Sequence, residues 1–393
     1  MRKWEVGEAK GPRLDEALAI LAGALPPVRF ETVPAVRAVG RRLARDLVAQ
    51  EDLPPFDTVA RDGYALRAAQ ASCKLEVAGW ALAGVPFRGT LRSGEAVAVA
   101  TGAPLPAGCD AVVPYEATAC GEGRLRCRVA LAPGDGVHRR GEEVAAGVLL
   151  AEEGEILAAG AAGTLVSLGL DRVAVGRRPR VGILATGSEL AAAPRAGEGQ
   201  IRSSNPQLLE ALVRRSGGVP VDLGTVPDDP AALGAALERP VDVCLITGGS
   251  SRGAADFTRG VLRAGAEVLL DGVAMRPGGT LLAVRRGGRL LLGLPGTPGA
   301  VRALGLLVVG PLLHRWQGAP SLLPPEVPAA LQAAMTFRPA GVERFVEVRL
   351  SVVGGCWTAG PPAALWREDS AYARIPPGTA ALAAGDAVGV LQV

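Results

Sequence analysis

The clearest pattern in the chain is an alternation of short apolar runs with helix-like segments between residues 176 and 319. Continuous apolar runs of about five residues are typical of parallel strands that are buried on both faces. The expected strands are Val181–Ala185, Val219–Gly224, Val243–Thr247, Glu267–Leu270, Leu281–Val284 and Leu290–Gly293. Helical spacing lies between them, in Pro206–Arg214, Ala231–Leu237 and Phe257–Ala264. Strands that alternate with helices predict a doubly wound, mostly parallel sheet.

The rest of the chain follows other patterns, which predict two further domains. Three segments of residues 1–175 repeat apolar residues at helical spacing, namely Leu14–Ala24, Val36–Leu47 and Ile156–Leu168. Between them, from about residue 50 to 145, short β-like runs alternate with glycine turns and predict a β-rich lobe; the runs are Leu75–Val77, Ala96–Ala100, Ala111–Val113 and Leu125–Leu131. A proline-rich linker begins at Pro320, and two later runs, Arg344–Val352 and Ala387–Val393, predict a small β-barrel. We therefore expect a multi-domain α/β protein with an α+β N-terminal region (1–175), an α/β domain (176–319) and a C-terminal β-barrel (320–393).

No segment predicts a membrane span. The longest apolar run, Leu304–Leu313, has about half the length of a span and contains Gly310-Pro311, so we interpret it as a buried helix end. Another apolar segment, Ala17–Leu25, follows Asp15-Glu16, which is the wrong flank for a secretory signal. We expect a cytoplasmic protein with no membrane partner.

Charge and composition narrow the range of partners. The formal net charge is +3, from 42 basic and 39 acidic residues, and 4% of residues are aromatic. This balance does not favour a nucleic-acid partner, and few aromatic rings are available to stack on bases. The six cysteines form no CxxC pair and there are two histidines, which argues against structural zinc and favours buried free thiols.

Candidate chemistry gathers where the predicted parallel strands end. Ligands of such sheets bind beyond the carboxyl ends of the strands, and Thr186-Gly187, Asp228 and Gly248–Asp256 all lie there. A glycine loop before a helix suits an oxyanion, because backbone amides can approach it, and Asp256 could hold a divalent metal on a bound phosphate. A simple chain reversal is the alternative for any one of these turns. Their convergence favours a binding site.

Two predicted helices begin with a suitable cap. Asn205 is a good N-cap before Pro206, and Asp229 caps the helix Ala231–Leu237. Asp228 is then free to point elsewhere.

The N-terminal region has weaker signals. Asp62 lies in a turn, where an aspartate is usually bonded to its own backbone, and Thr101–Pro106 is a second sharp turn. The segment Val137–Glu143 places cationic residues beside two carboxylates. From the residues alone a surface ion cluster is the favoured interpretation of this segment.

The motifs, taken in order, resemble those of the molybdopterin molybdenumtransferase family, which includes MoeA and the E-domain of gephyrin. The matching segments are Pro54–Ala65, Thr101–Pro104, Arg139–Glu143, Ser204-Asn205, Pro227–Asp229, Thr247–Gly253, Arg276–Thr280 and Gly293–Pro298. Their order and spacing over nearly the full length carry the resemblance.

The resemblance implies a sheet domain of the MoaB and MogA type and a reaction on adenylylated molybdopterin. In that reaction a divalent metal such as Mg²⁺ assists hydrolysis of the pyrophosphate bond, AMP leaves, and the dithiolene ligates molybdate. It also implies a homodimer, in which a cleft joins the N-terminal region of one subunit to the α/β domain of the other. A molybdopterin adenylyltransferase is an expected partner, since an enzyme must supply the adenylylated pterin.

The resemblance also assigns roles to residues. The implied catalytic residues are Asp62, Thr101, Glu142, Asp228 and Asp256, with Asp228 and Asp256 as metal ligands and Asp62 with Glu142 orienting water or substrate. The implied substrate-binding residues are Gly248, Gly249, Ser250, Ser251, Gly253, Arg276, Gly278, Pro295, Gly296 and Pro298.

Several positions depart from the family pattern. Where the family has a second lysine in its Lys-Pro-Gly-Lys-Pro loop, this chain has Gly279, followed by Thr280 instead of proline. Loss of a cation at an oxyanion site removes a charge-assisted hydrogen bond of roughly 1.5–3 kcal/mol. The further departures are Thr58, Val59, Arg61, Ala98, Glu143 and Thr297. The alternative function is therefore an impaired or tungstate-preferring paralogue that serves as a pterin-binding or scaffold protein.

Overall fold

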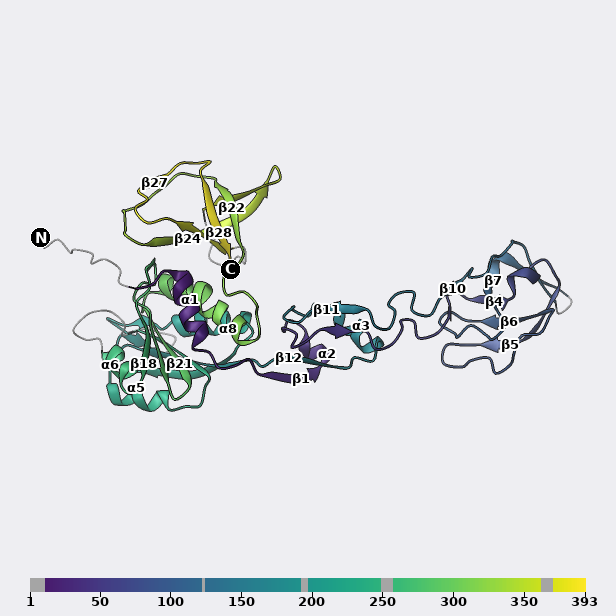
Figure 1. The fold of residues 1–393 in the computed structure, drawn as a ribbon, viewed down its shortest axis with the longest axis horizontal. Coiled ribbons are helices and arrows are strands. Elements are labelled where there is room, and N and C mark those ends of the chain that lie inside the picture. The colour runs from purple at the N-terminus through teal and green to yellow at the C-terminus, as the bar shows by residue number, and fades with distance from the viewer. Residues whose placement is uncertain (1–10, 122–123, 192–196, 249–256, 362–369) are drawn as a thin grey trace, which may run out of the picture. The chain divides into compact units, whose positions relative to one another are not determined.

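The fold was obtained as a computed structural model, which describes residues 11–121, 124–191, 197–248, 257–361 and 370–393 (Figure 1). The chain forms two compact units. The larger unit combines Met1–Glu31 with Val175–Val393, and the smaller unit is Thr32–Ala174. The predicted domain boundaries near residues 175 and 319 stay predictions.

The larger unit contains a six-stranded sheet. Its strand order is β16-β13-β17-β21-β20-β18. The bounds are β13 Arg180–Thr186, β16 Val219–Val226, β17 Val243–Thr247, β18 Glu267–Asp271, β20 Leu282–Arg286 and β21 Arg289–Leu294. The first four strands in this order are parallel, whereas β20 is antiparallel to both of its neighbours. All five residues of β17 are buried, which confirms the interpretation of that apolar run as a central strand.

Helices cover both faces of this sheet, as a doubly wound fold requires (Figure 1). On one face lie α1 Leu14–Gly23, α4 Asn205–Arg215, α7 Pro298–Leu304 and α8 Gly310–Trp316. On the other face lie α5 Pro230–Leu237 and α6 Phe257–Arg263. The alternation along β17 explains the two layers, because Val243 and Leu245 face the first set of helices while Cys244 and Ile246 face the second. Helix α1 thus packs within the larger unit, although its sequence precedes the smaller one.

The apolar run Leu304–Leu313 is not a helix end, contrary to the prediction. Helices α7 and α8 are joined by a π-helical turn, Gly305–Val309, in which the Gly310 N–H donates to the Gly305 carbonyl. Pro311 follows immediately, and a proline normally breaks a helix because it lacks an N–H and its ring meets the preceding turn. The wider π turn accommodates it, so the helix continues to Trp316.

The C-terminal strands close into a five-stranded barrel, as predicted. The order β24-β25-β22-β28-β26 is closed by pairing of β26 with β24, and β19 Met275–Arg276 adds to β24. The bounds are β22 Glu326–Leu331, β24 Glu343–Val353, β25 Cys356–Gly360, β26 Ser370–Ile375 and β28 Ala387–Gln392. A separate pair is formed by β23 Met335–Thr336 and β27 Ala381–Leu382.

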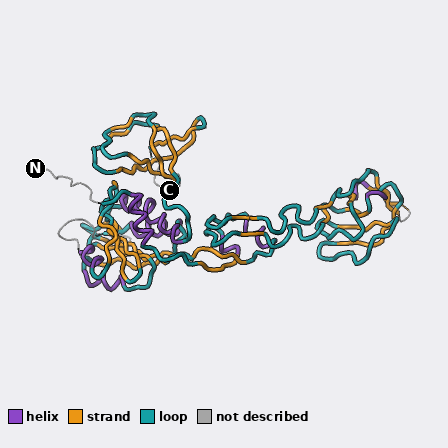
Figure 2. Tube along the Cα trace, in the orientation of Figure 1, coloured by secondary structure: helices purple, strands orange, loops and turns teal. Residues whose placement is uncertain are grey.

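The smaller unit is mostly strand and loop (Figure 2). Its main sheet has the order β7-β4-β6-β5-β9-β8, with apolar clusters on both faces. The bounds are β4 Gly63–Leu66, β5 Leu75–Ala81, β6 Glu95–Val99, β7 Ala111–Pro114, β8 Thr118–Gly121 and β9 Arg124–Cys127, with 3₁₀ turns at Ala68–Gln70 and Tyr115–Ala117. The short strands are β1 Phe30–Pro34, which pairs with β12 Arg172–Gly176; β2 Leu47–Val48, which pairs with β11 Leu149–Ala151; and β3 Thr58–Val59, which pairs with β10 Val137–His138. The β-rich lobe is therefore confirmed.

The predicted helix Val36–Leu47 is wrong. Only α2 Ala35–Ala38 is helical, because the chain turns at Gly40, whose φ is +73°. The backbone beyond it pairs with distant residues instead of with itself. The Leu43 N–H, for example, donates to the Glu155 carbonyl. The same pairing occupies the first residues of the predicted helix Ile156–Leu168. The observed helix, α3 Ala161–Ser167, therefore begins only at Ala161.

All six cysteines are free. Cys244 alone is buried, whereas Cys73, Cys120 and Cys356 are exposed, so the prediction of buried thiols is wrong for most of them. Burial raises the pKa of the Cys244 thiol to about 12. In the described ranges no helix combines the length and the apolar character needed to cross a membrane.

Candidate active site

The turns that follow the parallel strands lie side by side at the carboxyl ends of these strands. We call this end of the large sheet the rim. They are Thr186–Ser188 after β13, Pro227–Asp228 after β16, Gly248 after β17 and Pro295–Gly296 after β21. Position 248 requires glycine for two reasons. Its φ of +101° is in the left-handed region, and a Cβ there would lie 1.9 Å from the Thr186 carbonyl oxygen. The backbones of neighbouring turns can therefore approach each other and a ligand closely.

Asp228 lies on the rim and points away from the helix cap, as predicted. Its Oδ1 accepts a hydrogen bond from the Thr186 hydroxyl at 3.2 Å, and its Oδ2 accepts one from the Ser188 N–H at 3.1 Å. Asp229 caps α5 as predicted, with the N–H groups of Ala231 and Ala232 as donors at 3.1 and 3.3 Å. Each carboxylate oxygen of Asp228 retains a further lone pair, so the group is held in position and can still bind a cation.

Asn205 is not the N-cap of α4, as its sequence position had suggested. Ser204 occupies the cap position, and Asn205 is the first helical residue. Its Nδ2 donates to the Thr247 hydroxyl and to the Gly296 carbonyl, both at 2.8 Å. Thr247 in turn donates to the Pro295 carbonyl at 3.1 Å. The asparagine therefore joins the ends of β17 and β21, and the Ser204-Asn205 motif was the signal that could have predicted this role.

A small cavity of about 70 Å³ is enclosed at the rim. Its walls include Thr186, Asn205, Thr247, Gly248 and Gly296, together with the start of α7 at Pro298. Arg202 and Ser203 also line it, although neither was selected from the sequence. The exposed Arg202 supplies a cation at this cavity.

The predicted substrate-binding residues divide into three groups. Gly248, Gly296 and Pro298 line the enclosed cavity, and Pro295 adjoins it through the Thr247 hydrogen bond. Gly249, Ser250, Ser251 and Gly253, with the predicted metal ligand Asp256, lie outside the described residues. Arg276 and Gly278 belong to the loop between β18 and β20, at the far end of the same rim.

The loop that carries Arg276 is separated from Asp228. Strands β16 and β18 lie at opposite edges of the sheet, five strand spacings and about 24 Å apart. The loop is tightly packed. A Cβ on Gly278 would lie 2.8 Å from the Leu304 side chain, and one on Gly279 would lie 2.9 Å from the Met275 carbonyl. A lysine at position 279 therefore requires a shift of the local backbone.

In the smaller unit Asp62 and Thr101 are in direct contact. The Asp62 Oδ1 accepts hydrogen bonds from the Thr101 N–H at 2.7 Å and from its hydroxyl at 2.8 Å. These two bonds, the backbone one first, hold the pKa of Asp62 below its ordinary value of 3.8. The bonded partner lies 39 residues away, so Asp62 is not simply bonded to its own turn.

Glu142 lies in an ion cluster, as the residue pattern had indicated. Its Oε2 accepts from the Arg139 N–H at 2.8 Å and lies 3.5 Å from His138 Nδ1. Two aspartates that were not selected from the sequence complete the cluster. Asp57 binds Arg139 at 2.7 Å, and Asp52 binds Arg140 at 2.5 Å.

Hydrogen bonds control the acidity of the two aspartates in this cluster. The Arg140 N–H and the Arg139 side chain lower the pKa of Asp57, while the Ala146 N–H and the Arg140 side chain lower that of Asp52. Both carboxylates therefore stay charged at neutral pH. The structure joins Asp62 to Thr101, whereas Glu142 bonds within its own turn.

The donor set suits a metal that is shared with a substrate. In the described part of the chain no three His, Cys, Asp or Glu side chains form a metal-binding group. Asp228 offers a single carboxylate at the rim. Mg²⁺ is commonly held by one or two carboxylates, with water and substrate phosphates completing its octahedron. Asp228 fits this mode of binding.

Comparison with known proteins agrees with this geometry over most of the chain. Residues 13–169 match the MoeA N-terminal region (domain I and II), and residues 182–315 match a probable molybdopterin binding domain. The chain is 35% identical to molybdopterin molybdenumtransferase 2 of Mycobacterium tuberculosis, covering 89% of this chain and 91% of that protein. It is 33% identical to the molybdopterin molybdenumtransferase of Haemophilus influenzae, covering 78% of each chain.

A solved structure extends the similarity to the fold. The molybdopterin biosynthesis MoeA protein from Pyrococcus horikoshii aligns with a TM-score of 0.80 and 30% identity, covering 97% of this chain and 99% of that one. The identity, the coverage and the fold agree. The chain therefore belongs to the MoeA family of molybdopterin molybdenumtransferases.

Proposed function

We propose that this protein acts in molybdenum cofactor biosynthesis and inserts molybdate into adenylylated molybdopterin with hydrolytic release of AMP. The observation that supports this most is the rim, where Asp228 is held against the Thr186–Ser188 turn beside the enclosed cavity. In the reaction, water adds to a phosphorus of the diphosphate, one P–O bond breaks, and AMP leaves. The two sulfurs of the pterin dithiolene then bind molybdenum, and a molybdate oxygen leaves as water.

The residues of the rim would position the diphosphate. The Gly248 turn brings backbone close to the ligand, and Arg202 supplies a nearby positive charge. Asp228, with Asp256, which lies outside the described residues, would hold Mg²⁺, which when bound neutralises phosphate charge. Because the Asp228 carboxylate is already hydrogen bonded on both oxygens, it needs little reorganisation to do so.

Asp62 and Glu142 would orient water or substrate. Thr101 holds Asp62 in its ionised form through two hydrogen bonds, so this carboxylate can accept a hydrogen bond from water at neutral pH. Glu142 lies in a cluster of fixed charges, which restrains its turn. We infer that both act by positioning, since hydrogen bonds from Thr101 hold Asp62 and lower its pKa, and the Arg139 N–H holds Glu142.

We also propose that the protein is a homodimer and that a molybdopterin adenylyltransferase supplies its substrate. The dimer is supported by large apolar side chains that the smaller unit exposes outside its β-rich lobe. They are Val36, Val48, Val148, Leu149, Ile156 and Val166. Exposure of this kind is typical of surfaces that another chain covers. The cytoplasmic location stays a prediction.

The test of the proposed reaction is AMP release from adenylylated molybdopterin in the presence of Mg²⁺ and molybdate. The variant Asp228→Asn keeps both local contacts, because its amide oxygen can accept from Ser188 and its amide nitrogen can donate to the Thr186 hydroxyl. It loses the charge, so we expect AMP release to fall by about one to two decades. Asp256→Ala should have a similar effect.

The matched control is Glu267→Gln. Glu267 is another acidic residue at a strand of the same sheet, where it pairs with Arg285 away from the rim, and its loss should leave AMP release unchanged. Unaltered release by Asp228→Asn would remove this carboxylate from the mechanism. Replacing molybdate by tungstate in the same assay decides which oxyanion the protein uses, and faster insertion of tungstate would contradict the assignment of molybdate.

A further inference from the structure

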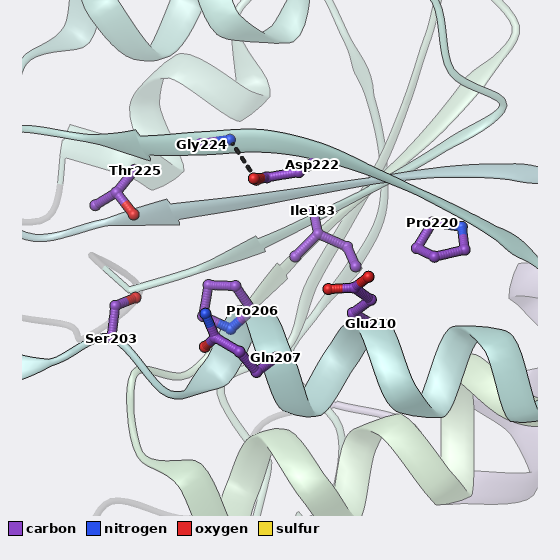
Figure 3. Close-up of a pocket in the computed structure, with 9 residues that line it drawn as sticks. All are labelled: Ile183, Ser203, Pro206, Gln207, Glu210, Pro220, Asp222, Gly224 and Thr225. Atoms are coloured by element: carbon purple, nitrogen blue, oxygen red, sulfur yellow. Dashed lines mark hydrogen bonds between the residues drawn. The ribbon is translucent and has the colours of Figure 1, made fainter. Parts of the chain in front are cut away.

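A groove adjoins the rim between helix α4 and the edge strand β16 (Figure 3). Its cavity of about 320 Å³ lies within the usual size range of small-molecule sites. Ile183 forms an apolar floor, and Figure 3 shows Glu210 reaching from α4 toward the sheet, with Asp222 on the opposite strand. None of these residues was a candidate from the sequence.

Ser203 connects this groove to the enclosed rim cavity, because it lines both. Its Oγ is buried and has no hydrogen-bond partner among the described residues. A buried hydroxyl without a partner is unfavourable in the free protein. A ligand that crosses from one cavity to the other would pass this hydroxyl and could bond to it.

Asn205, which lines the rim cavity, leaves a second unmatched atom. The Gly296 carbonyl can only accept, so the amide nitrogen of Asn205 must face it, which fixes the orientation of the amide. Both Nδ2 hydrogens are then used, on Gly296 and Thr247. The Oδ1 is buried and lacks a partner in the described part of the chain. As an acceptor, it can be satisfied only by an N–H or O–H donor.

The groove itself is also rich in acceptors. One oxygen of Glu210 binds Arg214, and one oxygen of Asp222 accepts from the Gly224 N–H at 2.8 Å. Each carboxylate therefore keeps a second oxygen for a ligand. The cation Arg202 lines the rim cavity instead. The acid Glu189 lines that cavity as well, whereas the charged side chains that line the groove, Glu210 and Asp222, are both acidic.

We propose that this groove is a subsite for a neutral part of the substrate that carries N–H or O–H donors, while the phosphate stays at the rim. A phosphate has no donors at neutral pH and would be repelled by Glu210 and Asp222, whereas a sugar or an amino-substituted heterocycle would satisfy both carboxylates and Ser203. The inference rests on the proposed function, whose substrate offers two such parts, the adenosine and the pterin.

The test is calorimetric titration of the full-length protein with two neutral probes, adenosine and 6-hydroxymethylpterin. We expect one of them to bind. Asp222→Asn keeps the acceptor for the Gly224 N–H but replaces the free acceptor by a donor. It should lower the affinity for that probe about tenfold or more. Glu210→Gln should act in the same direction. Glu267→Gln, which removes an equally arginine-paired acid outside the groove, should leave the affinity unchanged.

Ser203→Ala separates a binding role from a structural one. Since the hydroxyl has no described partner, its removal should leave the thermal unfolding midpoint unchanged or raise it. The affinity of the probe should fall by roughly threefold to tenfold. A lowered midpoint with unchanged affinity would contradict the proposed contact.

The two probes also identify which part of the substrate occupies the groove. Binding of adenosine assigns the nucleoside, and binding of the pterin assigns the heterocycle. If neither probe binds, or if the bound probe is insensitive to both Asp222→Asn and Glu210→Gln, the subsite is overturned. Wild-type AMP release without probe binding would reject only the subsite, whereas probe binding without AMP release would reject only the proposed reaction.

Discussion

Individual residues of the site behave differently from what their sequence context alone suggests. Asp228 follows a strand and precedes a capping aspartate, so it was expected to point away from the cap, but the sequence did not identify its partner, the Thr186–Ser188 turn, which binds both of its oxygens. Asn205 has the sequence of an N-cap but bonds to two other strand ends. In both cases every partner is at least 40 residues away in the sequence. Local propensity cannot predict such partners, because they depend on which strands become neighbours.

Asp62 offers a prediction at this scale. Its pKa in the folded protein is lowered first by the Thr101 N–H and then by the Thr101 hydroxyl. A depressed folded-state pKa stabilises the protein above the unfolded-state pKa, and this stabilisation is lost as the pH falls through the folded value. Thr101→Val removes only the hydroxyl bond. We expect the Asp62 carboxyl to titrate below 3.8 in the wild type and at a higher pH, still below 3.8, in the variant.

The measurement is NMR titration of the Asp62 side-chain carbon. Asp52 serves as an internal control, because its pKa is lowered by the Ala146 N–H and the Arg140 side chain and not by Thr101. Its titration should be the same in both proteins. An unchanged Asp62 titration in Thr101→Val would show that the hydroxyl does not support the carboxylate.

Secondary-structure elements were predicted well where burial alone decides them. The runs around Val243–Thr247 became central strands because an apolar segment of that length has few other ways to be buried on both faces. The prediction of a helix at Val36–Leu47 was wrong, because Gly40 and backbone pairing with residues near Glu155 override the helical spacing of its side chains. The prediction that Leu304–Leu313 is a helix end was wrong, because the π turn before Pro311 could not be inferred from composition.

The second prediction concerns the turn after β17. Gly248→Ala places a Cβ in a left-handed conformation and against the Thr186 carbonyl, so we expect a loss of roughly 1–3 kcal/mol in the free energy of unfolding. Gly234→Ala is the matched change. Gly234 lies within α5, where a Cβ would meet no atom within 4 Å, and alanine should add about 0.5–1 kcal/mol there. Urea denaturation measures both, and equal stabilities of the two variants would contradict the close packing of the rim.

At the scale of the whole molecule, the order of the motifs predicted the family and the kinds of fold in the chain, which are a β-rich lobe, a doubly wound α/β sheet and a small β-barrel. The arrangement of the site residues depended instead on the topology of the sheet. The predicted residues Asp228 and Arg276 both lie on the rim. They follow β16 and β18, however, which are the two outermost strands of the sheet. This separation follows from the strand order β16-β13-β17-β21-β20-β18, which is not the order of the strands in the sequence. The Gly249–Asp256 part of the predicted site lies outside the described residues.

The proposed dimer yields a third prediction. Val166 and Val352 are each 58% exposed, the first in α3 of the smaller unit and the second in the barrel strand β24. A charge at the centre of an apolar interface is costly, so Val166→Glu should shift the protein toward monomer in sedimentation velocity. Val352→Glu should leave the dimer intact. A wild-type protein that sediments as a monomer at all concentrations would exclude the dimer.

The most direct test of the central claim is ³¹P NMR of adenylylated molybdopterin mixed with the wild-type protein, Mg²⁺ and molybdate in a single turnover. We expect the diphosphate signals to disappear and phosphomonoester signals, including that of AMP, to replace them. With Asp228→Asn the diphosphate should persist over the same time. Diphosphate signals that persist unchanged with the folded wild-type protein would contradict the claim that this rim binds and cleaves the substrate.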